Sequence, residues 1–310
     1  MSHNTEPTFT FHKSDTLPDL DITTPLTFAY VGRELVLCQK RDLSWDILGG
    51  KIEKGETWMQ ALVREAYEEA GVHIENISLV GYILAENSKS TIYPPKSILP
   101  VTISFVKEID YEWSPKETIN RNIFRKSKVL QKMSSKKDFI FMKTVYENVE
   151  EFFTNFFPNI EFSYSEDNCF DIPTTQVMTF CENGNGEYCI VRDYDESHFS
   201  LPGGGCDLGE KDEDCAKREV LEEAQIQLSN LFRIANVIVK VFDAQNNVVS
   251  LSKHVRFHAR ASSIENFIPQ KNGMETIERK FVSVEELRKL VPLLQNSAGD
   301  EILKIIKKIK

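Results

Sequence analysis

The sequence predicts an α/β (α+β) protein made of two similar sandwiches, each a mixed sheet flanked by helices. Three observations support this fold class. The chain has 310 residues, of which 41% are hydrophobic, and this suffices for two domains that each bury a core. Strand-like and helix-like segments alternate along both halves. A long pattern of glycine and acidic residues also occurs twice, with the same internal spacing.

The repeated pattern is G-x5-E-x7-R-E-U-x-E-E-x-G-U, in which U is an apolar residue. The first copy runs from Gly50 to Val72 and the second from Gly204 to Ile226. The tripeptide Glu-Thr-Ile then recurs at 117–119 and 275–277. Since the similarity extends beyond the pattern itself, it predicts a duplication, with domains at residues 1–157 and 158–310.

The predicted elements follow the same order in both halves. Hairpins are expected at 26–39 and 176–192, because turns that contain glycine separate their apolar segments. A helix is expected inside each acidic pattern, at 57–70 and 212–224. The remaining predicted strands are 77–85, 99–108, 232–242 and 254–261, and the helices that close the halves are 139–153 and 300–309.

The acidic residues of each predicted helix fall on one face. Each helical residue advances by about 100° around the axis, so Glu65, Glu68 and Glu69 share an arc. An acidic run of this kind can also be an ordinary solvated helix face. In a cleft, however, the carboxylates would repel one another until divalent cations were bound, and oxygen ligands suit Mg²⁺ or Mn²⁺.

The doubled pattern resembles the box of the Nudix hydrolases, and the chain is similar to a tandem Nudix protein with two α/β/α sandwiches. The resemblance implies Mg²⁺ as the cofactor, with Mn²⁺ as a possible substitute. It also implies carboxylate ligands from the box helix and one backbone carbonyl ligand in each half. These ligands are Glu65, Glu68, Glu69 and Gly49 in the first half, and Glu219, Glu222, Glu223 and Gly203 in the second.

The same resemblance assigns further catalytic residues. Arg64, which points about 100° away from Glu65, pairs with Glu56 in the family pattern. The corresponding pair of the second half is Arg218 and Glu210. A general base outside the box often completes such a site. The candidates, drawn from the repeated Glu-Thr-Ile, are Glu117 and Glu275, with Glu278 as an alternative; the tripeptide can equally be a packing feature.

The implied function is Mg²⁺-dependent hydrolysis of a diphosphate bond in a nucleoside diphosphate linked to another moiety X. The alternative is a nucleotide-sensing or binding protein in which one or both domains do not hydrolyse. We expect a small-molecule nucleotide substrate, a cytoplasmic location, and an intramolecular pseudo-dimer or a homodimer. The net charge of −10 argues against general nucleic-acid or membrane binding, although a capped RNA end stays open as a substrate.

Three smaller expectations concern single residues and one segment. Gln225 replaces the last box glycine, in a left-handed position where a side chain costs on the order of 1 kcal/mol. The six cysteines are expected to be reduced thiols. The basic residues between Arg121 and Lys143 are expected to form a solvated face.

Overall fold

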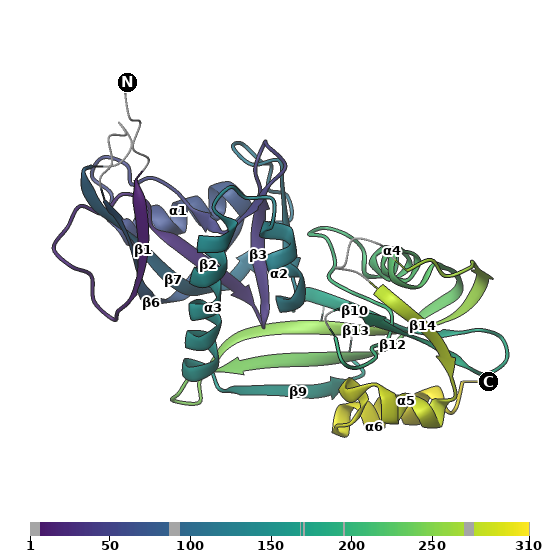
Figure 1. Cartoon of the computed structure of the whole chain (residues 1–310). Helices are drawn as coiled ribbons and strands as arrows, with labels where there is room; N and C mark the ends of the chain where they lie inside the picture. The colour runs from purple at the N-terminus through teal and green to yellow at the C-terminus, as the bar shows by residue number, and fades with distance from the viewer. Residues whose placement is uncertain are drawn as a thin grey trace. The chain divides into compact units, whose positions relative to one another are not determined.

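A computed structural model describes residues 7–86, 94–167, 169, 171–194, 196–269 and 276–309 (Figure 1). By contacts between residues, the chain divides into two compact units: residues 1–159 with 241–250, and residues 160–240 with 251–310. The domain boundary at 157/158 remains a prediction. Glu275 lies outside the described residues. No described helix is both long and apolar enough to cross a membrane.

The first unit contains a mixed sheet with the strand order β1-β6-β7-β2-β3-β4, in which β5 also pairs with β2 and β8 with β3. Strands β2 and β7 are parallel, whereas β1–β6, β6–β7, β2–β3 and β3–β8 are antiparallel. The strands are β1 (Thr8–Lys13), β2 (Leu26–Val31), β3 (Glu34–Gln39), β4 (Trp45–Asp46), β5 (Leu48–Gly49), β6 (Val72–Glu86), β7 (Lys96–Ile109) and β8 (Asn120–Phe124).

Helices cover both faces of this sheet (Figure 1). On one face, Phe28 and Tyr30 of β2 pack against Tyr146 and Phe153 of α3 (Phe139–Phe156), with ring centroids 6.0 and 4.6 Å apart. The short helix α2 (Lys126–Met133) precedes α3. On the opposite face lies α1 (Trp58–Ala70), the helix of the first box, which buries Ala61, Leu62 and Ala66.

The second unit repeats this topology. Its strand order is β14-β11-β10-β13-β12-β9, with β10 and β13 parallel, and it matches the order β8-β3-β2-β7-β6-β1 of the first unit. Its strands are β9 (Asn159–Ser165), β10 (Thr174–Glu182), β11 (Tyr188–Asp193), β12 (Ile226–Phe242), β13 (Val248–Ile264) and β14 (Thr276–Val282). The predicted mixed sheet flanked by helices is thus confirmed in both halves.

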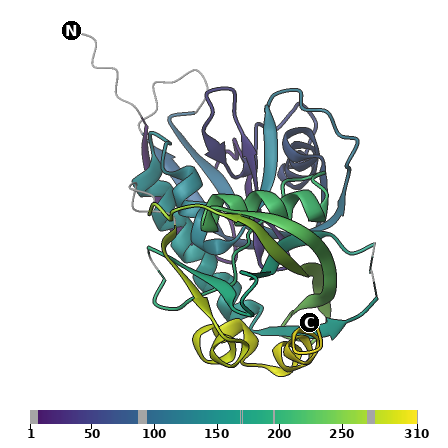
Figure 2. The ribbon, with the colours of Figure 1, turned by 90° about the vertical axis from the view of Figure 1, so that its right-hand side faces the viewer.

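The second sheet also lies between helices (Figures 1 and 2). The box helix α4 (Asp212–Ala224) packs on Val255 and Phe257 of β13. On the other face lie α5 (Val284–Leu290), a 3₁₀ turn (Pro292–Leu294) and α6 (Ser297–Ile306). Ile302, Leu303 and Ile306 of α6 are buried against this face.

The expectation of a solvated basic face fails at its first residue. Arg121 lies on β8 and is only 6% exposed. Its Nη1 donates to the carbonyl of Ala70 at the end of α1, and its guanidinium stacks on Trp113 at 4.7 Å from the ring centroid. The carbonyls at a helix C-terminus attract a cation, and this accounts for a buried arginine here.

Candidate functional site

The carboxylates of the first box lie on the side of α1 that faces the sheet and the glycine loop. Glu65 and Glu69 are 8% and 3% exposed, whereas the Glu68 side chain is 36% exposed. The backbone of Gly50 approaches Glu65 so closely that a Cβ there would lie 2.1 Å from Oε1 of Glu65. A side chain at position 50 would therefore force the Glu65 carboxylate to move.

Two groups hold Glu69. The backbone N–H of Gly49 donates to its Oε2 at 2.9 Å, and Nζ of Lys40 forms an ion pair with its Oε1. Burial raises the pKa of the Glu69 carboxyl, while Lys40 opposes that rise. Lys40 follows β3 and was not predicted from the sequence; a basic residue directly after a strand next to the box was the available signal.

Arg64 links the remaining carboxylates of the first box. Its Nε and Nη2 donate to the two oxygens of Glu56, both at 3.0 Å, so the ion pair implied by the resemblance is present. Its Nη1 also donates to Glu65 at 2.9 Å and to Glu68 at 2.8 Å. The 100° separation of Arg64 from Glu65 on the helix did not anticipate this, because the long arginine side chain reaches back across the helix surface.

The second box reproduces these contacts. Arg218 donates to both oxygens of Glu210, at 2.9 and 2.7 Å, and its Nη1 lies 2.6 Å from Glu219 and 3.4 Å from Glu222. The N–H of Gly203 donates to Glu223 at 3.0 Å. A Cβ on Gly204 would lie 2.2 Å from Glu219. Both halves thus fold the box in the same way.

The three candidates for a general base have different surroundings. Glu117 is exposed and close enough to Glu65 to contribute, after burial, to the raised pKa of Glu65. Thr118 beside it donates to the backbone carbonyl of Glu69 at 2.8 Å, so the repeated tripeptide also has a packing role. Glu278 forms ion pairs with Lys280 and Arg192, which lower its pKa. Glu275 is outside the described residues.

The expectation of six reduced cysteines is wrong for Cys206 and Cys215, which form a disulfide with their Cα atoms 5.4 Å apart. Arg218 explains their proximity, since it binds Glu210 and the carbonyl of Gly205 and so draws the box loop onto the first turn of α4. Among the described residues, the Cys206, Glu210 and Cys215 ligand atoms alone form a group of three within 4.8 Å. The disulfide and the Arg218 ion pair make that group unsuitable for a metal.

The box carboxylates fit a hard divalent cation better. They offer only oxygen atoms, as Mg²⁺ and Mn²⁺ prefer. In the first half, oxygens of Glu65 and Glu68 already converge on one positively charged atom, Nη1 of Arg64. The donor set therefore suits a cation that would join or replace the chain's own positive charges.

The two halves differ beside the last box glutamate. In the strand register, Arg121 lies opposite Cys38 in the first sheet and Arg279 lies opposite Val191 in the second. Both arginines donate to the last carbonyl of their box helix, so Cys38 and Val191 occupy equivalent positions. The residue two positions after Cys38 is Lys40, and the residue two positions after Val191 is Asp193. A base in the first half thus corresponds to an acid in the second.

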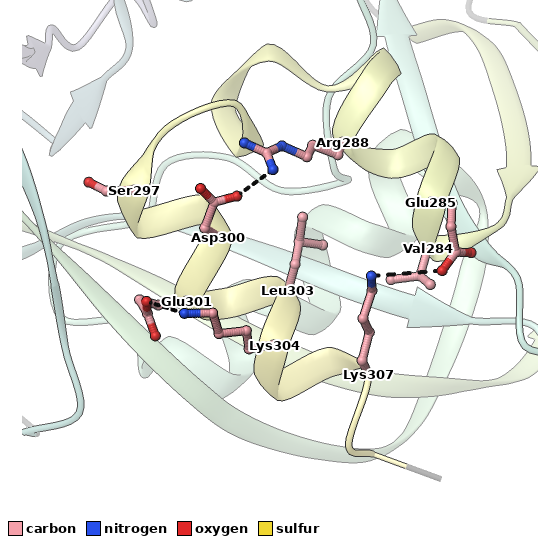
Figure 3. A pocket seen from close by; sticks show the side chains of 9 residues that line it. All are labelled: Val284, Glu285, Arg288, Ser297, Asp300, Glu301, Leu303, Lys304 and Lys307. Carbon is pink, nitrogen blue, oxygen red and sulfur yellow. Dashed lines mark hydrogen bonds and ion pairs between the residues drawn. The ribbon is translucent and has the colours of Figure 1, made fainter.

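A groove of about 580 Å³ lies between α5 and α6, and no box residue lines it (Figure 3). Arg288 pairs with Asp300 at 2.7 Å and Lys307 with Glu285 at 3.8 Å across the groove, while Lys304 pairs with Glu301 at 2.7 Å along α6. Arg288, Lys304 and Lys307, which line the groove, are thus each paired with a carboxylate.

Comparison with known proteins places this site in a family. Among solved structures, the chain is similar to the pyrophosphohydrolase BsRppH of Bacillus subtilis (20% identity, 48% of this chain and 90% of that chain, TM-score 0.37). It is also similar to an ADP-ribose pyrophosphatase of Streptococcus suis (22%, 44% and 95%, TM-score 0.33). The model of the NUDIX domain matches residues 27–138 and 173–303, most of the chain. The chain therefore belongs to the Nudix hydrolase family.

Proposed function

We propose that the chain hydrolyses a diphosphate bond in a nucleoside diphosphate linked to another moiety, with Mg²⁺ or Mn²⁺ held by the box carboxylates. The observation that carries this proposal is the agreement between the two boxes. In each half, an arginine joins three box glutamates and a glycine N–H orients the fourth. A solvated acidic face would need neither these contacts nor a glycine pressed against a buried carboxylate.

In this proposal, Glu65, Glu68 and Glu69 hold the cation together with the Gly49 carbonyl, and the corresponding residues do so in the second half. When bound, the cation neutralises phosphate charge and lowers the pKa of a water molecule. The chain's own residues position these groups. Arg64 orients Glu65 and Glu68. Lys40, which pairs with Glu69, would lie close enough to a phosphate held at this site to contact one of its oxygens. Glu117 accepts a proton from the attacking water.

Paired substitutions test the proposal. We expect Glu68→Gln with Glu69→Gln to reduce turnover by the first site at least 100-fold, because neutral amides bind Mg²⁺ far more weakly. Glu222→Gln with Glu223→Gln should do the same for the second site. The assay measures phosphate release with Mg²⁺ from dinucleotides, sugar nucleotides, oxidised nucleoside triphosphates and capped RNA.

Glu75→Gln is the matched control, since Glu75 is an exposed acid of the first unit that pairs only loosely, at 3.6 Å, with Lys107. This variant should keep full activity. Unchanged hydrolysis in both paired variants would rule out the carboxylate mechanism. Nucleotide binding by the native chain without any phosphate release would instead favour the nucleotide-binding alternative.

A further inference from the structure

The second unit buries an arginine in its core. Arg256 of β13 is only 1% exposed, and it lies between Val255 and Phe257, which face α4. Its side chain therefore points to the other face of the sheet, beneath α5 and α6. Its Nε has no hydrogen-bond partner among the described residues, and its Nη1 makes one long bond, 3.4 Å, to the carbonyl of Val255.

The fold itself does not require a charge at this position, as the first unit shows. The loop glycine of each half packs against one strand residue, Leu26 in the first unit and Met178 in the second. In the parallel register of each sheet, Leu26 lies opposite Val101 and Met178 lies opposite Arg256. Val101 is fully buried, so a small apolar side chain fills the same place in the same topology. Since a buried, unpaired cation is strongly unfavourable, Arg256 needs a compensating negative charge that Val101 does not.

A small cavity beside Arg256 can hold that charge. It has a volume of about 10 Å³ and is lined by Arg256, Asn296, Ala298 and Gly299, together with apolar side chains. That volume admits one water-sized particle. Asn296, Ala298 and Gly299 belong to the N-terminus of α6, a helix of 10 residues. The N–H of Gly299 already donates to Oδ1 of Asn296 at 2.8 Å, so the attraction of this helix N-terminus for an anion comes from its dipole and from the other N–H groups of the first turn.

We propose that Arg256 and the N-terminus of α6 form a binding site for one small inorganic anion of the size of chloride. The site takes a halide rather than a polyphosphate, because its volume of about 10 Å³ is far below that of a phosphate chain. Burial lowers the pKa of Arg256 to about 10, so the guanidinium is charged at neutral pH and attracts an anion. All residues of the site lie in the second unit, and none belongs to its box.

Chloride dependence of stability tests the site. We expect the thermal unfolding of the full chain to shift upwards by about 5 °C when gluconate, which is too large for the cavity, is replaced by chloride at constant ionic strength. The Arg256→Val variant, which copies the first unit, should lose this shift. Arg260→Val is the matched control, because it removes an exposed arginine of the same strand that pairs with Glu182, away from α6; it should keep the shift.

A second measurement locates the anion without any variant. Crystals of the full chain soaked in bromide should show an anomalous peak beside Arg256 and the first turn of α6. An equal chloride shift in native protein and Arg256→Val would overturn the proposal. A bromide soak with no peak at Arg256 would overturn it as well, even if the variant failed to fold.

Discussion

At the scale of single residues, the two box helices end in the same left-handed conformation with different side chains. Gly71 has φ 56° and Gln225 has φ 54°. A Cβ on Gly71 would lie 2.3 Å from atoms of Trp113 and Arg121, which stack over the helix end. Gln225 instead exchanges two side-chain hydrogen bonds with the backbone of Ile268, at 2.8 and 2.9 Å. These bonds offset part of the strain predicted from the sequence.

We therefore expect Gly71→Gln to destabilise the first unit by about 3 kcal/mol, from backbone strain and the clash with Trp113. Gln225→Gly should change the stability of the second unit by less than about 1 kcal/mol, since relief of strain offsets the two lost bonds. Calorimetric unfolding of both variants measures the difference. Equal losses would show that the stacked Trp113 does not select glycine.

The sequence predicted the box residues better than their neighbours. The spacing of Glu65, Glu68 and Glu69 depends on helix geometry alone, so it could be derived without tertiary structure. Lys40 reaches Glu69 only because β3 lies beside α1, and Arg121 reaches Ala70 only because β8 pairs with β3. Such contacts depend on strand order, which local patterns do not encode.

At the scale of elements, the two box loops are fixed by different means. The first helix begins with a capping box between Thr57 and Gln60. The N-cap residue of the second helix, Lys211, makes no side-chain cap bond, and the Cys206–Cys215 disulfide joins its loop to its first turn instead. A covalent link thus serves where the hydrogen-bonded cap is missing.

Replacing both cysteines with serine should cost the second unit about 2–3 kcal/mol, the loop-closure value for a short cross-link. Hydrogen exchange should accelerate across residues 204–226, and dithiothreitol should produce the same acceleration in the native chain. Residues 50–72 of the first box serve as the internal control and should stay protected. Equal exchange in native and variant protein would show that the disulfide does not hold the loop.

At the scale of the whole molecule, one topology is used twice. The alternation of segments and the repeated box were sufficient to predict two mixed sheets with helices, and the structure has them. Strands β1, β4, β5, β8, β9 and β14 were not predicted, nor were α2 and α5. Edge strands and short helices gain most of their stability from packing, so their sequences carry weak periodic signals.

The duplication also predicts two unequal metal sites. Lys40 pairs with Glu69 and would oppose a cation at the proposed first site, whereas the corresponding residue of the second half, Asp193, has the opposite charge. We expect Mn²⁺ titration, followed by electron paramagnetic resonance, to show two affinity classes. Lys40→Met should tighten the weaker class by about tenfold or more, and Asp193→Asn should weaken the stronger class. A single class in the native chain, unchanged by either substitution, would contradict this assignment.

The ion pairs of Arg64 with Glu56, Glu65 and Glu68 have a practical consequence for handling the protein. Because the guanidinium donates to Glu56, Glu65 and Glu68, loss of the proposed metal would still leave one positive charge among these three carboxylates. The first box should therefore keep its shape after dialysis against a chelator and recover as soon as metal is returned. Arg64 would thus act as a counterion that keeps these carboxylates in place when no metal is bound.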